Sequence, residues 1–323
     1  MIRQLLMKYV FGPVPSRRLG RSLGIDPIPL KTCNWNCIYC QLGRTSPPAN
    51  DRRDYFSPEA IITEVNAALA SHEPGQIDWL TFAGSGEPTL HASLGWMIRE
   101  LKACTEIPIA VITNGSLLYL PEVRRHLLPA DAVMPTLDAG SERLYRRIDR
   151  PVAELTFGRL VEGMIALRNE FEGKLWIEVM LIKGLNDSVA ALEDIASVIR
   201  RIRPDDVHIN LPVRPPTEAS VEVPDDETLA RAQAILGEVA HIVAPADVQI
   251  DLGDEDDLAD SVMEIVKRHP MSEEGLVRAL SLRSAREVAA ALAQLTASGR
   301  ARVTTRHGER FWSDAKARYV ASR

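Results

Sequence analysis

Short apolar runs alternate with longer amphipathic stretches between residues 58 and 239. Apolar runs bounded by polar or glycine-containing sequence indicate buried strands, whereas apolar residues recurring every three or four positions indicate helices. The predicted strands are 77–83, 107–113, 132–137, 175–182 and 207–211. The predicted helices are 58–70, 93–103, 157–170, 189–201 and 226–239. Strands that alternate with helices predict an α/β fold around a parallel sheet.

Each predicted strand is followed by a polar or glycine-containing segment. These segments are 84–89, 113–115, 138–140, 183–187 and 214–216. The carboxyl ends of parallel strands meet at one edge of a sheet, where α/β proteins bind their ligands. We therefore expect the five segments to converge on one face of the fold.

The pattern changes after residue 250. Residues 251–260 hold six acidic residues and no basic one, which predicts a solvated linker or helix entry rather than a cation site. Helical periodicity follows at 261–267, 272–280 and 284–297, and two short strands, 302–305 and 310–313, flank a turn. Three helices and a hairpin predict a winged helix-turn-helix. The predicted parts are a core domain at 1–250, an acidic linker at 251–260 and a winged-helix domain at 261–323.

Composition narrows the class of protein. The chain has 323 residues, of which 46% are hydrophobic and 25% charged, as in an ordinary globular protein. No apolar run approaches the roughly eighteen residues that a membrane span needs, and the first eight residues are too charged for a secretory signal. We therefore expect a cytoplasmic protein with no membrane contact.

The strongest chemical signal is the spacing of three cysteines. Cys33, Cys37 and Cys40 form a C-x3-C-x2-C motif, whereas Cys104 lies far along the chain. A zinc site would need a second ligand pair, and structural disulfides would need an oxidising compartment. The spacing favours an iron-sulfur cluster, which normally takes four thiolates. Three ligands would leave one iron open to a small molecule, unless Cys104 completes the site of a plain electron carrier.

Several residues near the predicted strand ends could bind a ligand or serve structural roles. In Gly84-Ser85-Gly86-Glu87, the glycines would let the backbone approach a ligand closely, and we expect Glu87 to be exposed; a tight turn is the alternative. Thr113 and Asn114 precede a glycine and could form a turn. Asp138 could bind ligand or cap the next helix. Tyr39 could shield the cluster or pack in the core, and Arg214 could bind a cofactor or substrate anion.

The cysteine motif, with Tyr39 before the last cysteine, and the segment Gly84 to Pro88 resemble the signature of the radical S-adenosylmethionine (SAM) superfamily. The segment at 11–24, the Thr136-Leu137-Asp138 run with Arg150-Pro151, and the segment at 180–187 resemble a bacterial group of Fe-S oxidoreductases related to the wyosine-tRNA synthases. The resemblance covers about the first 250 residues.

This resemblance implies a partial (β/α)6 TIM-like barrel and two cofactors, a 4Fe-4S cluster and S-adenosylmethionine. It implies cluster ligands at Cys33, Cys37 and Cys40, and contact between the Gly84–Glu87 segment and the amino group of SAM. It also implies that Thr113, Asn114 and Asp138 lie near the ribose or carboxylate of SAM, with Tyr39 near the nucleobase. The implied reaction cleaves SAM reductively to a 5'-deoxyadenosyl radical, which abstracts hydrogen from a substrate, with an external electron donor such as flavodoxin or ferredoxin.

One departure from the wyosine synthases separates this chain from them. They carry a second cluster on upstream cysteines, and no cysteine precedes Cys33 here, so formation of the tricyclic wyosine base is not expected. Residues 261–323 hold 12 basic and 6 acidic residues. We expect RNA or DNA contact there through four arginines: Arg283, Arg286, Arg306 and Arg310. The rival interpretation is an Fe-S redox-sensing regulator that binds nucleic acid.

Overall fold

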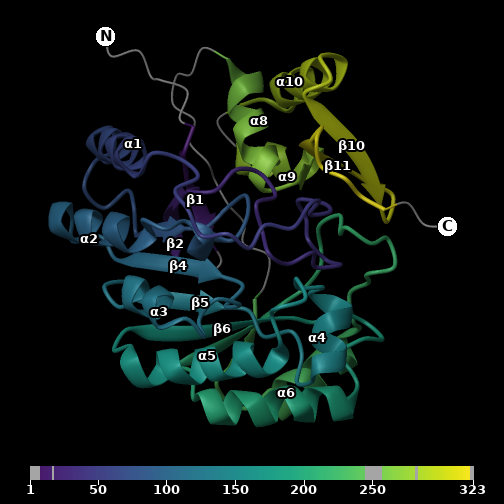
Figure 1. The fold of residues 1–323 in the computed structure, drawn as a ribbon. Helices are drawn as coiled ribbons and strands as arrows, with labels where there is room; N and C mark the ends of the chain where they lie inside the picture. The colour runs from purple at the N-terminus through teal and green to yellow at the C-terminus, as the bar shows by residue number, and fades with distance from the viewer. Residues whose placement is uncertain (1–7, 17, 244–256, 281–282, 321–323) are drawn as a thin grey trace.

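The computed structural model describes residues 8–16, 18–243, 257–280 and 283–320, and Figure 1 shows their arrangement. An eight-stranded sheet runs in chain order from β1 to β8. β1 pairs with β2 antiparallel, and all later neighbours pair parallel. The strands are β1 Val10–Ser16, β2 Gly20–Ile25, β3 Trp79–Phe82, β4 Ile109–Thr113, β5 Ala132–Pro135, β6 Lys174–Met180, β7 Asp206–Asn210 and β8 Ala240–Ile242. The predicted α/β fold is confirmed, with a sheet that is mostly parallel.

Helices connect the parallel strands, as βα units require. They are α1 Pro58–Ala70, α2 Leu94–Cys104, α3 Pro121–Leu127, α4 Glu142–Ile148, α5 Phe157–Glu170, α6 Val189–Ile202 and α7 Asp226–Leu236, with a short 3-10 turn, η1, at Pro88–Leu90. The start of α1 shows how nearby residues in the sequence determine where a helix begins. Ser57 accepts a hydrogen bond from the Ala60 amide, and Pro58 occupies the first turn, where its missing N–H costs nothing.

The five strands predicted from periodicity are present, but three further strands of the eight-stranded sheet and two of its connecting helices were missed. β1 and β2 carry glycine and proline, including Gly12-Pro13, and β8 has only three residues. These features weaken the period-two pattern on which strand prediction depends. The missed helices, α3 and α4, have seven residues each. A helix of two turns repeats its apolar pattern too few times to be recognised.

The C-terminal segment contains α8 Leu258–Arg268, β9 Met271–Ser272, α9 Glu273–Ala279, α10 Ala285–Ala297, β10 Ala301–Arg306 and β11 Glu309–Asp314. The three helices and the hairpin lie close to their predicted positions, and β9 adds a third strand beside β11. Their buried apolar residues form a cluster separate from the large core around the eight-stranded sheet. The winged-helix assignment and the domain boundaries stay predictions. Residues 251–256 of the predicted acidic linker lie outside the described residues. Asp257 is the N-cap residue of α8.

Polar contacts join the C-terminal segment to the loop that follows β2. Tyr319 donates a hydrogen bond to the Gln41 carbonyl at 2.8 Å, and Gln41 donates to the Arg268 carbonyl at 3.1 Å. In Figure 1 the purple segment after β2 lies between the C-terminal helices and the sheet. The segment that carries the three cysteines is therefore held from both sides. Within the described residues, no helix is long and apolar enough to span a bilayer.

Candidate functional site

The three motif cysteines lie together in the loop between β2 and α1. Cys33, Cys37 and Cys40 are each half-buried, and each thiol interacts electrostatically with the other two. Cys104 is instead the exposed last residue of α2. The fold therefore groups the three cysteines of the motif and leaves the fourth at the surface.

Backbone hydrogen bonds hold this loop against the carboxyl ends of the strands. The Asn36 amide donates to the Asp149 carbonyl at 3.0 Å, and the Ile38 amide donates to the Ile148 carbonyl at 2.9 Å. On the other side, the Glu218 amide donates to the Ile38 carbonyl at 2.9 Å. The stretch that contains Cys37 is thus fixed between the end of α4 and the segment after β7.

The surroundings of the thiols disfavour a free thiolate at Cys33 and at Cys37. Burial raises the pKa of Cys33 to about 12, and burial together with the charge of Asp149 raises that of Cys37. Lys31 places its Nζ 3.0 Å from Cys40 Sγ. Burial lowers the pKa of Lys31, but the nearby cysteines outweigh this effect and raise it. A coordinating metal deprotonates a thiol outright, and Lys31 would offset part of the negative charge of the three thiolates.

The thiols are not arranged to share a single ion. Among the residues that the structure describes, no three His, Cys, Asp or Glu side chains converge on one metal position. In an iron-sulfur cluster the thiolates bind the cluster from several directions, so they need not meet at a point. Three adjacent half-buried cysteines with one nearby cation fit a cluster.

The segment from Gly84 to Glu87 packs against the cysteine loop. A Cβ on Gly86 would lie 2.0 Å from the Thr32 carbonyl oxygen, and the Lys31 amide donates to the Ser85 carbonyl at 2.6 Å. We predicted close approach of this backbone to a ligand. In the structure, Gly86 permits close approach to the residues just before Cys33, and contact between this segment and a ligand stays a prediction.

Glu87 is buried, and the expectation of exposure is wrong: only 1% of its surface is accessible. Its carboxylate accepts hydrogen bonds from the Thr89 amide and hydroxyl at 3.0 and 2.5 Å, from the Thr113 hydroxyl at 2.6 Å and from the Asn114 amide at 2.7 Å. Burial raises the pKa of Glu87, and these four donors oppose the rise. The carboxylate joins the ends of β3 and β4.

Asn114 extends this network to the cluster loop. Its side-chain amide lies 2.8 Å from Asn34 Oδ1 and 3.7 Å from Cys33 Sγ. The Thr113 hydroxyl donates its hydrogen bond to Glu87, whereas the Asn114 side chain contacts a cysteine of the motif. Arg214 lies elsewhere around the loop and donates to Gln41 Oε1 at 2.8 Å, next to Cys40.

Tyr39 and Asp138 form a second buried link. The Tyr39 hydroxyl donates to Asp138 Oδ2 at 2.5 Å, and the Met180 amide donates to Asp138 Oδ1 at 2.6 Å. The Asp138 carboxylate therefore accepts hydrogen bonds from Tyr39 and from the Met180 amide of β6. Ser141, rather than Asp138, is the N-cap residue of α4. Burial raises the pKa of Asp138.

Sequence reasoning missed two acids at the site. Asp26 follows β2 and accepts hydrogen bonds from the Ser85 amide at 3.1 Å and hydroxyl at 2.5 Å. Asp149 is fully buried, and burial and the charge of Asp138 raise its pKa. Asp149 directly precedes Arg150-Pro151, which was noted as part of a motif, and Asp26 ends a strand that the pattern did not reveal.

Comparison with known proteins agrees with this geometry. The model of the Radical SAM superfamily matches residues 28–196, about half of the chain. A UPF0026 protein of Methanocaldococcus jannaschii is 38% identical over 233 residues, covering 72% of each chain. A protein of Brachyspira hyodysenteriae named GTPase Obg is 46% identical over 230 residues, 71% of this chain. The match spans only 34% of that protein's length, about a third.

The fold has a solved counterpart. The crystal structure of a radical SAM methyltransferase from Sphaerobacter thermophilus superimposes with a TM-score of 0.52, covering 68% of this chain and 65% of that one, at 20% identity. At this identity the likeness concerns the fold alone. The family match includes Cys33, Cys37 and Cys40, the Gly84–Glu87 segment and Asp138. By this match, the chain belongs to the radical SAM superfamily and is an enzyme of that class.

Proposed function

We propose that the chain binds a 4Fe-4S cluster through Cys33, Cys37 and Cys40 and binds S-adenosylmethionine beside it. The observation that carries this proposal is the grouping of three half-buried cysteines at the carboxyl ends of the strands, with Cys104 at the surface. When bound, the two cofactors supply a 5'-deoxyadenosyl radical that abstracts hydrogen from a substrate.

The residues of the chain would prepare the site for this reaction. The Gly84–Glu87 segment and Asn114 lie against the cysteine loop, where they could offer polar groups to SAM. Tyr39 and Asp138 would line the same face, and Arg214 holds Gln41 beside the last cysteine. The C-terminal segment covers the loop and would limit entry of water.

The wider setting is part of the same proposal. We expect a partial (β/α)6 barrel, an external electron donor such as flavodoxin or ferredoxin, and a cytoplasmic location that keeps the thiols reduced. A winged-helix domain at the C-terminus would contact RNA or DNA. Three of its four expected arginines, Arg283, Arg306 and Arg310, are engaged within the chain. Arg306 donates to the Pro212 and Val221 carbonyls, and Arg310 pairs with Glu273 at 3.1 Å. Arg286 remains the best candidate for nucleic-acid contact.

The test is anaerobic reconstitution with iron and sulfide, followed by addition of dithionite and SAM and measurement of 5'-deoxyadenosine. We expect product from the wild-type protein, none from Cys37→Ala, and wild-type iron content and product from the matched control Cys104→Ala. Loss of the cluster in Cys104→Ala would contradict the three-cysteine site. An intact cluster with no SAM cleavage and no SAM-induced change in its EPR spectrum would favour the redox sensor instead.

A further inference from the structure

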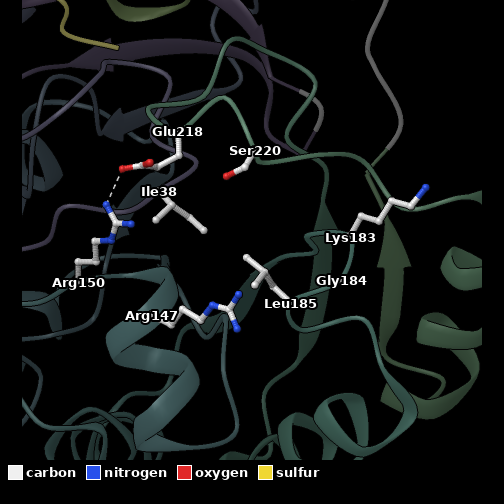
Figure 2. Close-up of a pocket in the computed structure, with 8 residues that line it drawn as sticks. All are labelled: Ile38, Arg147, Arg150, Lys183, Gly184, Leu185, Glu218 and Ser220. Carbon is white, nitrogen blue, oxygen red and sulfur yellow. Dashed lines mark hydrogen bonds and ion pairs between the residues drawn. The ribbon is translucent and has the colours of Figure 1, made fainter. Parts of the chain in front are cut away.

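A cavity of about 330 Å3 lies beside the cysteine loop, which contributes Ile38 to its lining. Figure 2 shows the eight residues that line it. They are Ile38, Arg147, Arg150, Lys183, Gly184, Leu185, Glu218 and Ser220. Pockets of this size accept small organic molecules. Residues from four separate parts of the chain meet here only because the fold brings the strand ends together.

The cavity shares its walls with the loop that carries Cys37. Ile38, the next residue, lines the cavity, and its backbone is hydrogen-bonded to Ile148 on one side and Glu218 on the other. Arg150, two residues after Ile148, also lines the cavity beside Ile38 (Figure 2), and its backbone carbonyl accepts from the Asn36 amide at 3.2 Å. A molecule in this cavity would therefore lie one residue from a thiol that we assign to the cluster.

The charge of the cavity is positive. Three lining side chains are cationic and one is acidic. Arg150 is paired with Glu218 at 2.6 Å, so that these two charges largely offset one another. Within the described residues, Arg147 and Lys183 form no ion pair. In Figure 2 the Arg147 guanidinium lies beside Leu185, while the Lys183 ammonium lies at the rim and points away. Arg147 is thus the cation best placed to receive an anion.

The remaining lining gives the cavity a mixed character. Ile38 and Leu185 present apolar surface, and the Ser220 hydroxyl points into the cavity (Figure 2). A planar guanidinium binds carboxylate or phosphate through two parallel hydrogen bonds, and adjacent apolar side chains favour a ligand with an apolar body. None of the residues assigned above to SAM lines the cavity, so a second molecule could occupy it beside SAM.

We infer that this cavity binds the substrate of the radical reaction, and that the substrate is a small organic anion whose carboxylate or phosphate contacts Arg147. The inference rests on the proposed function, because a substrate site has meaning only beside a radical-generating centre. It assigns a substrate class, with the apolar part of the molecule against Ile38 and Leu185 and the anionic group on Arg147.

The test measures binding to the full-length reconstituted protein in the presence of SAM and without reductant. The probes are phenyl phosphate and benzoate, with benzyl alcohol as the neutral counterpart, each titrated to about 10 mM, in the weak-binding range. We expect at least one anion to bind and the alcohol not to bind. Binding of phenyl phosphate but not benzoate would identify phosphate as the preferred group. Binding of benzoate but not phenyl phosphate would identify carboxylate. Failure of both anions, or equal binding of the alcohol, would overturn the inference.

Matched variants locate the bound anion. Arg147→Gln should weaken binding about tenfold, equivalent to about 1.4 kcal/mol, and Arg147→Lys should retain part of it. Arg143→Gln removes the same charge from an exposed position on α4 that does not line the cavity, and it should bind as wild type. Ser220→Trp places a large side chain in the cavity from an exposed position and should block both anions. Equal losses in Arg143→Gln and Arg147→Gln would overturn the assignment.

A second readout tests proximity to the cluster. After reduction, the paramagnetic cluster should broaden the phosphorus resonance of bound phenyl phosphate, and Cys37→Ala should show no broadening. Binding that depends on Arg147 without broadening would overturn the substrate assignment. Failure of this inference can be distinguished from failure of the proposed function. SAM cleavage without anion binding would overturn only this inference, whereas anion binding without SAM cleavage would overturn the proposed function on which it rests.

Discussion

Arg268, the last residue of α8, forms a buried ion pair with Asp26, which follows β2. The Arg268 Nε lies 3.1 Å from Asp26 Oδ2, and the two side chains are 1% and 5% exposed. Asp26 also binds Ser85 through that residue's amide and hydroxyl. A residue of the C-terminal segment therefore supports the loop that we assign to SAM binding, although 242 positions separate it from Asp26.

Loss of this pair should destabilise the protein. Arg268→Ala would leave Asp26 buried with only the Ser85 donors, and removal of one partner from a buried pair costs about 3–5 kcal/mol. We expect a loss near the lower end in urea unfolding of the cluster-free protein, with weaker SAM binding after reconstitution. Lys267→Ala, one residue earlier and partly exposed, should change stability by less than about 0.5 kcal/mol. Equal effects of the two substitutions would contradict a specific role for the Arg268–Asp26 pair.

Gly86→Ala should disrupt the cluster site. Its Cβ would meet the Thr32 carbonyl oxygen at 2.0 Å and an Ile28 methyl group at 2.7 Å. One of the two backbones must shift, and overpacking of this kind costs about 1–3 kcal/mol. We expect reduced iron content after reconstitution. Gly158→Ala is the control, because the nearest atom lies 3.9 Å from its added Cβ. Normal iron content in Gly86→Ala would show that the loop can move aside.

Thr113→Val should weaken the link between β3 and β4. The substitution preserves shape but removes a hydroxyl that donates to the buried Glu87 carboxylate at 2.6 Å. Loss of a hydrogen bond to a charged group costs about 1.5–3 kcal/mol, which urea unfolding would measure. Thr63→Val removes a hydroxyl that donates to a backbone carbonyl within α1. A cost no larger than that of this control would show that Glu87 finds another donor.

His269 should make stability depend on pH. Burial, followed by the charges of Arg214 and Arg268, lowers the pKa of His269 from 6.5 to about 3. Between these values the unfolded chain binds a proton that the folded protein does not. The contribution of His269 is therefore complete above about pH 6.5 and is lost as the pH falls toward 3, by at most about 1.4 kcal/mol per pH unit.

Comparison of unfolding curves between pH 7 and 5 checks this prediction. His269→Gln should flatten the dependence relative to wild type, because the amide does not titrate. His307→Gln, whose side chain is 62% exposed, should follow the wild-type curve. Parallel curves for wild type and His269→Gln would mean that His269 is accessible to protons in the folded state.

The sequence predicted those parts of the molecule that depend on local order. The strands β3 to β7, the starts of α1 and α5 and the three cysteines were all recognisable, because apolar periodicity, caps and motif spacing act within a few residues. The same reasoning located Glu87, Asn114 and Asp138 at strand ends. It could not predict that Glu87 would be buried beneath four donors, two of which, from Thr113 and Asn114, belong to another strand end.

Only the tertiary structure determined how these parts meet. The Arg268–Asp26 pair joins residues that no local pattern connects, and the cavity beside Ile38 exists because α4, the segment after β6 and the segment after β7 converge on the cysteine loop. Burial raises the pKa of Cys33 and Cys37, and the packing around the cavity leaves Arg147 as a cation without an acidic partner among the described residues. The order of residues along the chain determines the proposed ligands and the strand ends. The distances between these groups and their burial arise from long-range packing.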